Sequence, residues 1–151
     1  MKGLYSIGDL AREAGIKVQT VRYYEQIGIL PEGERTSGNQ RRYDEAARRR
    51  LNFIRHAREL GFPLDAIREL LALADQPDTP CDRADAIARR QLDAVDRRIA
   101  RLVSLRAELS RMIDDCSAGP IAECRIIETL GDHSLCLTDH SAGANGESAP
   151  L

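Results

Sequence analysis

Apolar residues recur at helical spacing in several short stretches of the first 75 residues, and residues that start or stop helices bound each stretch. Ser6 is suited to cap the first stretch and Gly15 to end it, while Asp44 and Gly61 bound a later one. The predicted helices run from after Ser6 to about Ala14, from Lys17 to Glu25, from Glu45 to about Leu60 and from Leu64 to about Ala74. Two short helices joined by a tight glycine turn, like the first pair, are typical of a helix-turn-helix.

The segment between the second and third predicted helices contains turn-forming residues and a short basic strand. Residues 31–40 are rich in Pro, Gly, Ser and Asn, and Arg41–Tyr43 follows as an extended stretch. A Gly/Asn turn flanked by basic residues predicts a β-hairpin wing. Residues 1–75 are therefore predicted to form a winged helix-turn-helix, an architecture that binds DNA.

A much longer apolar repeat occupies the second half of the chain. Residues 82–115 contain neither Gly nor Pro, and their apolar residues recur at spacings of three, four and seven. These residues are Ala88, Leu92, Val95, Ile99, Leu102, Leu109 and Ile113. A helix of this length extends roughly 50 Å and is too long to bury its apolar stripe on the small head. Pairing with a second copy is favoured; the alternative is a helix that folds back on its own head.

Composition limits the class of protein. Hydrophobic residues make up 42% of the chain and charged residues 30%, with a formal net charge of −2, which indicates a soluble, folded protein. No apolar run approaches the roughly 20 residues of a membrane span, and the N-terminus lacks the apolar core of a signal peptide. We therefore expect a cytoplasmic protein that does not contact a membrane and keeps its thiols reduced.

Basic and polar residues in the predicted head are candidates for DNA binding. Arginines cluster between residues 41 and 58, which indicates either a phosphate-binding face or simply a solvated basic face. On the second helix, Arg and Lys can bind phosphate or guanine, Gln can pair with adenine, and a Tyr hydroxyl can reach a phosphate. The candidates on that helix are Lys17, Gln19, Thr20, Arg22 and Tyr23.

Six short motifs in the head resemble the MerR family of transcriptional regulators. They are Ser6–Ala11, Thr20–Glu25, Gly28–Pro31, Asn39–Tyr43, Phe53–Ile54 and Leu60–Leu64, and the resemblance covers residues 4 to about 130. It implies a homodimer joined by antiparallel long helices that reads an inverted repeat in promoter DNA. Inducer binding then bends and untwists the DNA so that RNA polymerase can align both promoter elements. The resemblance adds Asn39, Arg41, Arg42 and Tyr43 as DNA contacts in the wing, and it leaves Tyr24 inside the head.

Three of the four cysteines lie at the two ends of the long helix. Cys81 precedes the helix, and Cys116 and Cys124 follow it around a loop that contains Gly119 and Pro120. In an antiparallel dimer the start of one helix lies beside the end of the other, so Cys81 of one subunit would meet Cys116 and Cys124 of its partner. Thiolates prefer soft or borderline metal ions. The alternative interpretation is that these cysteines are small buried hydrophobic residues.

The resemblance also bears on which metal binds. Within the family, copper(I) sensors carry Ser where this chain has Cys81, whereas sensors of zinc, cadmium, lead or mercury carry Cys. Cys81 therefore favours a divalent ion as inducer, namely Zn, Cd, Pb or Hg. The spacing from Cys116 to Cys124 also resembles the copper loop, so a Cu(I) site made of those two thiols is the alternative. By family analogy, the regulated genes encode metal efflux or detoxification functions.

The fold predicted from these patterns is mainly α-helical and has four parts. A winged helix-turn-helix head spans 1–75, an antiparallel coiled-coil dimerisation helix spans 81–115, a metal-binding loop and short helix span 116–140, and a disordered tail spans 141–151. His133, Cys136 and His140 could complete the metal site or form an auxiliary one, or could be incidental residues of a polar tail. A thiol oxidoreductase is the alternative of another class, but Cys-x-x-Cys and a βαβ unit are both absent, so no enzymatic activity is expected.

Overall fold

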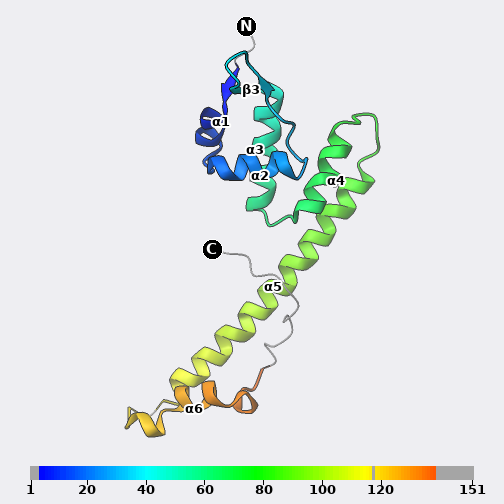
Figure 1. Cartoon of the computed structure of the whole chain (residues 1–151). Helices are drawn as coiled ribbons and strands as arrows, with labels where there is room; N and C mark the ends of the chain where they lie inside the picture. The colour runs from blue at the N-terminus through cyan, green and yellow to red at the C-terminus, as the bar shows by residue number, and fades with distance from the viewer. Residues whose placement is uncertain (1–3, 117, 139–151) are drawn as a thin grey trace. The chain divides into compact units, whose positions relative to one another are not determined.

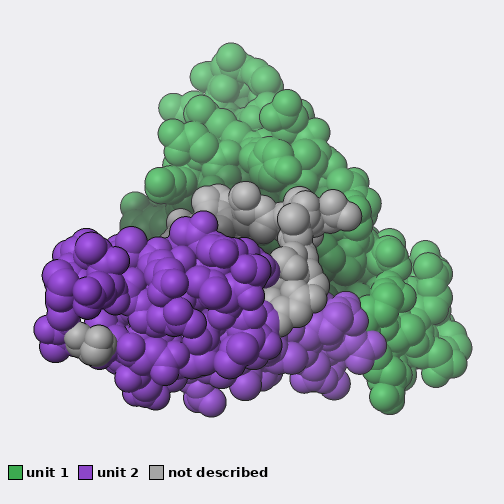
Figure 2. Space-filling view, turned by 90° about the horizontal axis from the view of Figure 1, so that it is seen from below, with its two compact units in different colours: residues 1–91 green, residues 92–151 purple. Residues whose placement is uncertain are grey.

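The computed structural model describes residues 4–116 and 118–138, which form helices and a small three-stranded sheet (Figure 1). The described chain divides into two compact units, residues 1–91 and residues 92–151, which Figure 2 colours separately. The mainly α-helical class predicted from the sequence is confirmed. His140 and the predicted disordered tail at 141–151 lie outside the described residues.

Every helix expected from the sequence is present, with ends that differ by a few residues at most. The helices are α1 (Ile7–Ala14), α2 (Val18–Gln26), α3 (Glu45–Glu59), α4 (Leu64–Ala74), α5 (Asp82–Asp114) and α6 (Arg125–Gly131). Two short 3-10 helices that the sequence analysis did not predict, η1 (Ile121–Glu123) and η2 (His133–Leu135), flank α6.

Local signals account for the ends of the helices in the head. Ser6 and Asp9 form a capping box at the start of α1, in which Ser6 Oγ accepts the Asp9 N–H at 3.1 Å. Gly15 ends that helix with a φ of 65°, a left-handed conformation that favours glycine. Asp44 caps α3 because its carboxylate accepts the N–H of Ala47 at 2.8 Å.

The sheet contains the predicted wing. Strands β2 (Glu34–Arg35) and β3 (Arg41–Tyr43) are antiparallel, and the N–H of Thr36 donates to the Gln40 carbonyl at 2.9 Å where the hairpin turns. The third strand, β1 (Tyr5–Ser6), pairs with the other edge of β3 and aligns Tyr5 with Tyr43. The wing is thus joined to the start of α1 through β3.

The core of the first unit is formed by aliphatic side chains from the helices, together with two tyrosines. Its most deeply buried members include Leu10, Val21, Ile29, Leu30, Tyr43, Leu51, Ile54 and Ile67. Tyr24 is also buried, as the sequence predicted. Since α1, α2, α3, α4 and the wing all contribute to this core, α2 is presented to solvent on a rigid support.

The beginning of α5 belongs to the first unit. Ile87 is only 2% exposed, and Gln91 Nε2 donates to the Leu60 carbonyl at the end of α3 at 3.0 Å. A Cβ atom on Gly61 would lie 2.8 Å from that Gln91 nitrogen, so the turn and the helix are in close contact. The first unit therefore extends past the predicted head boundary at residue 75.

The second unit carries an exposed apolar stripe on α5 and a small, partly polar interior. Leu92, Ile99, Leu102, Leu109 and Ile113 are each more than half exposed. Met112 and Glu108 of α5 and Thr129 of α6 are buried. Among the described residues, no helix is long and apolar enough to cross a membrane.

Candidate DNA-binding and metal-binding sites

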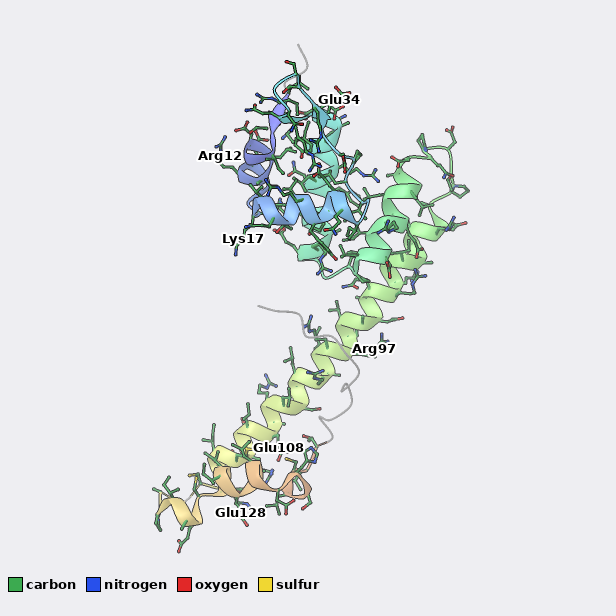
Figure 3. All side chains as sticks on the ribbon, in the orientation of Figure 1. Arg12, Lys17, Glu34, Arg97, Glu108 and Glu128 are labelled. Carbon is green, nitrogen blue, oxygen red and sulfur yellow. The ribbon has the colours of Figure 1, made fainter. Side chains whose placement is uncertain are left out.

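Helix α2 presents one face to the core and the other to solvent. Val21, Tyr24 and Glu25 are buried, whereas the predicted DNA contacts are on the outer face. Lys17, Gln19, Arg22 and Tyr23 are exposed, and Thr20 is half-buried. Lys17 projects from the start of α2 in Figure 3. The helix therefore offers cationic and hydrogen-bonding groups to a ligand, as a recognition helix requires.

The wing separates its predicted DNA contacts into two groups. Asn39 is exposed at the turn with a φ of 60°, and Arg42 is half-buried and near Gln40. Arg41 and Tyr43, on either side of Arg42, point to the opposite face of β3 and enter the head. Arg35, which donates to Asn39 at 2.7 Å, is an exposed cation that the sequence analysis missed. The sequence signal for Arg35 is its position: a hairpin that turns at Gly38 and Asn39 places Arg35 opposite Arg41 on the neighbouring strand.

Glu25 explains why Arg41 and Tyr43 face inward. Its carboxylate accepts hydrogen bonds from Tyr43 Oη at 2.8 Å, from Arg41 at 2.7 Å and from the Gly33 N–H at 3.2 Å. Tyr43 is only 1% exposed, and its burial, followed by its bond to Glu25, raises the pKa of the phenol. The prediction that the Tyr43 side chain contacts DNA therefore disagrees with its position in the core, and Arg41 is already paired.

Most of the arginine cluster on α3 also binds partners within the head. Arg48 donates to Glu45, and Arg50 donates to the Ile29 carbonyl at 2.8 Å and to Asp75 at 3.3 Å. Arg48, followed by Tyr5, lowers the pKa of Glu45 to about 2. Arg50 therefore joins α3 to the segments around Ile29 and Asp75, and Arg48 also pairs with Glu13 of α1 at 3.5 Å, so these two arginines have structural roles.

The loop after α5 brings Cys116 and Cys124 together. Cys116 follows α5 and is exposed, and Cys124 is the N-cap residue of α6 and is half-buried. Burial and the neighbouring Cys124 raise the pKa of Cys116. The backbone N–H of Ile127, then that of Ile126 and the Cys116 thiol, lower the pKa of Cys124. The first turn of α6 therefore favours a thiolate at Cys124, the form that binds metal ions.

The third predicted ligand, Cys81, is exposed immediately before α5, and its carbonyl accepts the N–H of Asp85. Within the described part of one chain, no group of three or more His, Cys, Asp or Glu side chains could hold a metal ion. A single described chain thus offers a pair of thiols, Cys116 and Cys124. Tetrahedral and trigonal metal ions require at least one further ligand.

The auxiliary candidates do not join this pair in the described chain. Cys136 is half-buried, and its burial, followed by the carboxylate of Glu108, raises the pKa of its thiol. His133 is exposed on η2. Neither completes a group of three ligands with Cys116 and Cys124.

Comparison with known proteins gives matches over both units. Residues 5–74 match the family described as MerR HTH family regulatory protein, and residues 48–112 match the family described as MerR, DNA binding. The HTH-type transcriptional regulator ZntR of Escherichia coli (strain K12) is 41% identical over 130 residues, covering 84% of this chain and 92% of ZntR. The mercuric resistance operon regulatory protein of Serratia marcescens is 39% identical over 127 residues, covering 83% of this chain and 86% of that protein.

A solved structure extends the likeness to three dimensions. The transcription regulator PbrR691 from Ralstonia metallidurans CH34, in complex with lead(II), has a TM-score of 0.72 and 40% sequence identity to this chain. The match covers 83% of this chain and 98% of PbrR691. These relatives are transcriptional regulators, which confirms that the chain is not an enzyme. From its head motifs through its long helix, the chain belongs to the MerR family of transcriptional regulators.

Proposed function

We propose that this protein is a metal-responsive regulator that binds an inverted-repeat promoter as a homodimer. A divalent soft ion would be bound by Cys116 and Cys124 of one subunit and by Cys81 of the partner subunit. The observation that carries the proposal is the contact between the Cys116 and Cys124 thiols at the start of α6. It supplies two thiolate ligands and leaves the site in need of a third.

The exposed stripe on α5 supports the dimer. Large apolar side chains such as Leu102 and Ile113 are 58% and 64% exposed, and a long apolar seam of this kind is typical of a coiled-coil interface. A helix of 33 residues is about 50 Å long. Antiparallel pairing along that length brings Cys81, before one α5, to the end of the partner's helix.

Three thiolates favour a divalent ion. Zn²⁺, Cd²⁺, Pb²⁺ and Hg²⁺ accept three or four ligands, whereas Cu(I) is satisfied by two thiolates. The lead(II) complex of PbrR691 and the name of the mercuric regulator from Serratia marcescens point in the same direction. A Cu(I) sensor that uses only Cys116 and Cys124 is the alternative, because these are the two thiols in contact within one chain.

In the proposed mechanism, the metal changes the shape of bound DNA. The two heads contact the half-sites, and binding of the ion favours a dimer in which the promoter is bent and untwisted for RNA polymerase. The heads supply Lys17, Gln19, Thr20, Arg22 and Tyr23 from α2 and Asn39 and Arg42 from the wing. Genes for metal efflux or detoxification are the proposed targets.

The shared site can be tested with mixed dimers in transcription in vitro. One subunit carries Cys81→Ser, and the other carries Cys116→Ser with Cys124→Ser. If Cys81 acts across the dimer, the mixed dimer retains one complete site and responds to metal, while both parent homodimers remain silent. A silent mixed dimer would contradict ligation across the interface.

The metal is identified by adding Zn, Cd, Pb, Hg and Cu(I) separately to the wild-type protein under reducing conditions. Activation by a divalent ion, with loss of activation in Cys81→Ser, is the expected result. Activation by Cu(I) alone, retained in Cys81→Ser, would establish the two-thiol alternative. Cys136→Ser is the matched control and should respond like the wild type.

A further inference from the structure

Glu25, near the end of α2, is a buried carboxylate whose partners lie outside its own helix. Its side chain is only 2% exposed, and its oxygens bind Arg41, Tyr43 and Gly33. A buried carboxylate is costly unless it is paired and hydrogen-bonded, and these three donors meet that requirement. The network therefore joins the last turns of α2 to the wing.

The packing around this carboxylate leaves little room for the wing to shift. A Cβ atom on Gly33 would come within 2.9 Å of the Arg42 carbonyl oxygen and of the Tyr43 ring. The loop that connects α2 to β2 thus lies directly against β3. Its Gly33 N–H reaches Glu25 because no side chain separates the two segments.

The same network decides which of the two β3 arginines, Arg41 or Arg42, is available to DNA. Arg41 is 2.7 Å from Glu25 and 3.7 Å from Glu32, so its charge is neutralised inside the head. Side chains alternate across a strand, which turns Arg42 to the other face of β3. Arg42 has no ion pair among the described contacts, and its nearest side-chain acceptor is Gln40 at 3.4 Å.

We propose that Glu25 is a positioning residue for DNA binding, which fixes the wing against the recognition helix so that Arg42 and Arg22 contact one duplex together. Arg41 contributes to the same positioning through its ion pair with Glu25 and does not itself contact DNA. The inference rests on the proposed roles of Arg22 and Arg42 in DNA binding, and it is independent of the metal site.

A double-mutant cycle tests the proposal with the full-length protein. Arg22→Ala and Arg42→Ala are each made in the wild type and in Glu25→Gln, and binding to a labelled duplex selected with the wild-type protein is measured at several salt concentrations. In the wild type, each substitution removes one contact from each of the two heads, so it should weaken binding about tenfold and lower the salt slope by about 2. In Glu25→Gln, the Arg42→Ala effect should fall below about twofold, while the Arg22→Ala effect remains about tenfold.

The outcomes separate positioning from general loss of structure. Equal Arg42→Ala effects in both backgrounds would overturn the proposal, as would loss of the Arg22→Ala effect in Glu25→Gln. If Arg42→Ala has no effect in the wild type, Arg42 is not a DNA contact and the inference fails, while the mixed-dimer test of the metal site is unaffected. Tyr43→Phe, which removes one bond to Glu25 but keeps the ring, is the milder second variant and should reduce the Arg42→Ala effect partially.

Discussion

The carboxylate of Glu108, a residue labelled on α5 in Figure 3, accepts the backbone N–H of Leu137 at 3.1 Å, and this bond joins α5 to the segment that follows η2. Thr138 Oγ1 donates to the same carboxylate at 3.3 Å, and Arg111 donates to the Leu135 carbonyl at 3.0 Å. These bonds close a loop of chain that contains Cys116, Cys124 and α6. They fix residues 135–138, which follow α6 and η2, against α5.

Replacing Glu108 should therefore loosen the thiol pair without removing a thiol. In Glu108→Ala we expect faster hydrogen exchange at the amides of residues 135–138 and about tenfold weaker metal binding, the usual effect of removing a group that orients ligands. Competition with a chromophoric chelator measures the affinity. Glu128→Ala, which removes an exposed partner of Arg125, is the matched control and should bind metal like the wild type. Unchanged affinity in Glu108→Ala would show that the closed loop is not needed.

Acid should weaken the head through Glu45. Arg48 and Tyr5 lower the pKa of this carboxyl from 4.5 to about 2, so its contribution to stability is complete above pH 4.5 and is lost as the pH falls toward 2. Urea unfolding of Glu45→Gln should therefore give a free energy that depends less on pH between 4.5 and 2 than that of the wild type. Tyr5→Phe, which removes one of the two causes, should lie between them. Parallel curves for all three proteins would contradict this assignment.

A charge on the exposed stripe of α5 should dissociate the proposed dimer. Leu102 is 58% exposed in the single chain, and Leu102→Glu would place carboxylates in an apolar seam. Sedimentation should find the wild type as a dimer and Leu102→Glu largely as a monomer. Arg101→Glu changes the neighbouring exposed position and should leave the dimer intact. Equal association of both variants would place the interface elsewhere.

Two glycines of the wing should differ in their tolerance of a methyl group. At Gly33 the added Cβ would lie 2.9 Å from the Arg42 carbonyl, whereas at Gly38 the nearest atom is Thr36 Oγ1 at 3.8 Å. Gly33→Ala should lower the free energy of unfolding by about 1–3 kcal/mol. Gly38→Ala should change it by less than about 1 kcal/mol. Thermal or urea unfolding measures both, and equal losses would mean that the Gly33 contact relaxes easily.

Helix positions were predictable because their signals are local. Ser6, Gly15, Asp44 and Gly61 are read directly from the sequence and act within a few residues of their own positions. The β-hairpin wing was predicted from its turn, but the bounds of β2 and the pairing of β1 with β3 were not, because each of these strands has only two residues, too few to show alternation. The contact between Cys116 and Cys124 was predicted from the Gly119–Pro120 loop, which allows the chain to turn back.

The roles of Arg41 and Tyr43 could not be read from the wing sequence. Their shared partner, Glu25, lies 16 and 18 positions away, and the pairing exists only after the wing folds onto α2. Sequence also did not predict the partners of the arginine cluster, because Arg50 pairs with Asp75, which lies 25 positions away. A basic residue identified from the sequence is available to DNA only if no acidic side chain pairs with it in the folded protein.

The contacts of Ile87 and Gln91 with the head have a mechanical consequence. The first turns of α5 are anchored to the DNA-binding unit at two points, by the buried Ile87 side chain and by the bond from Gln91 to the turn after α3. A twist applied to this part of α5 should therefore rotate the head with it. The beginning of the long helix and helix α2 should thus rotate together as parts of one packed unit.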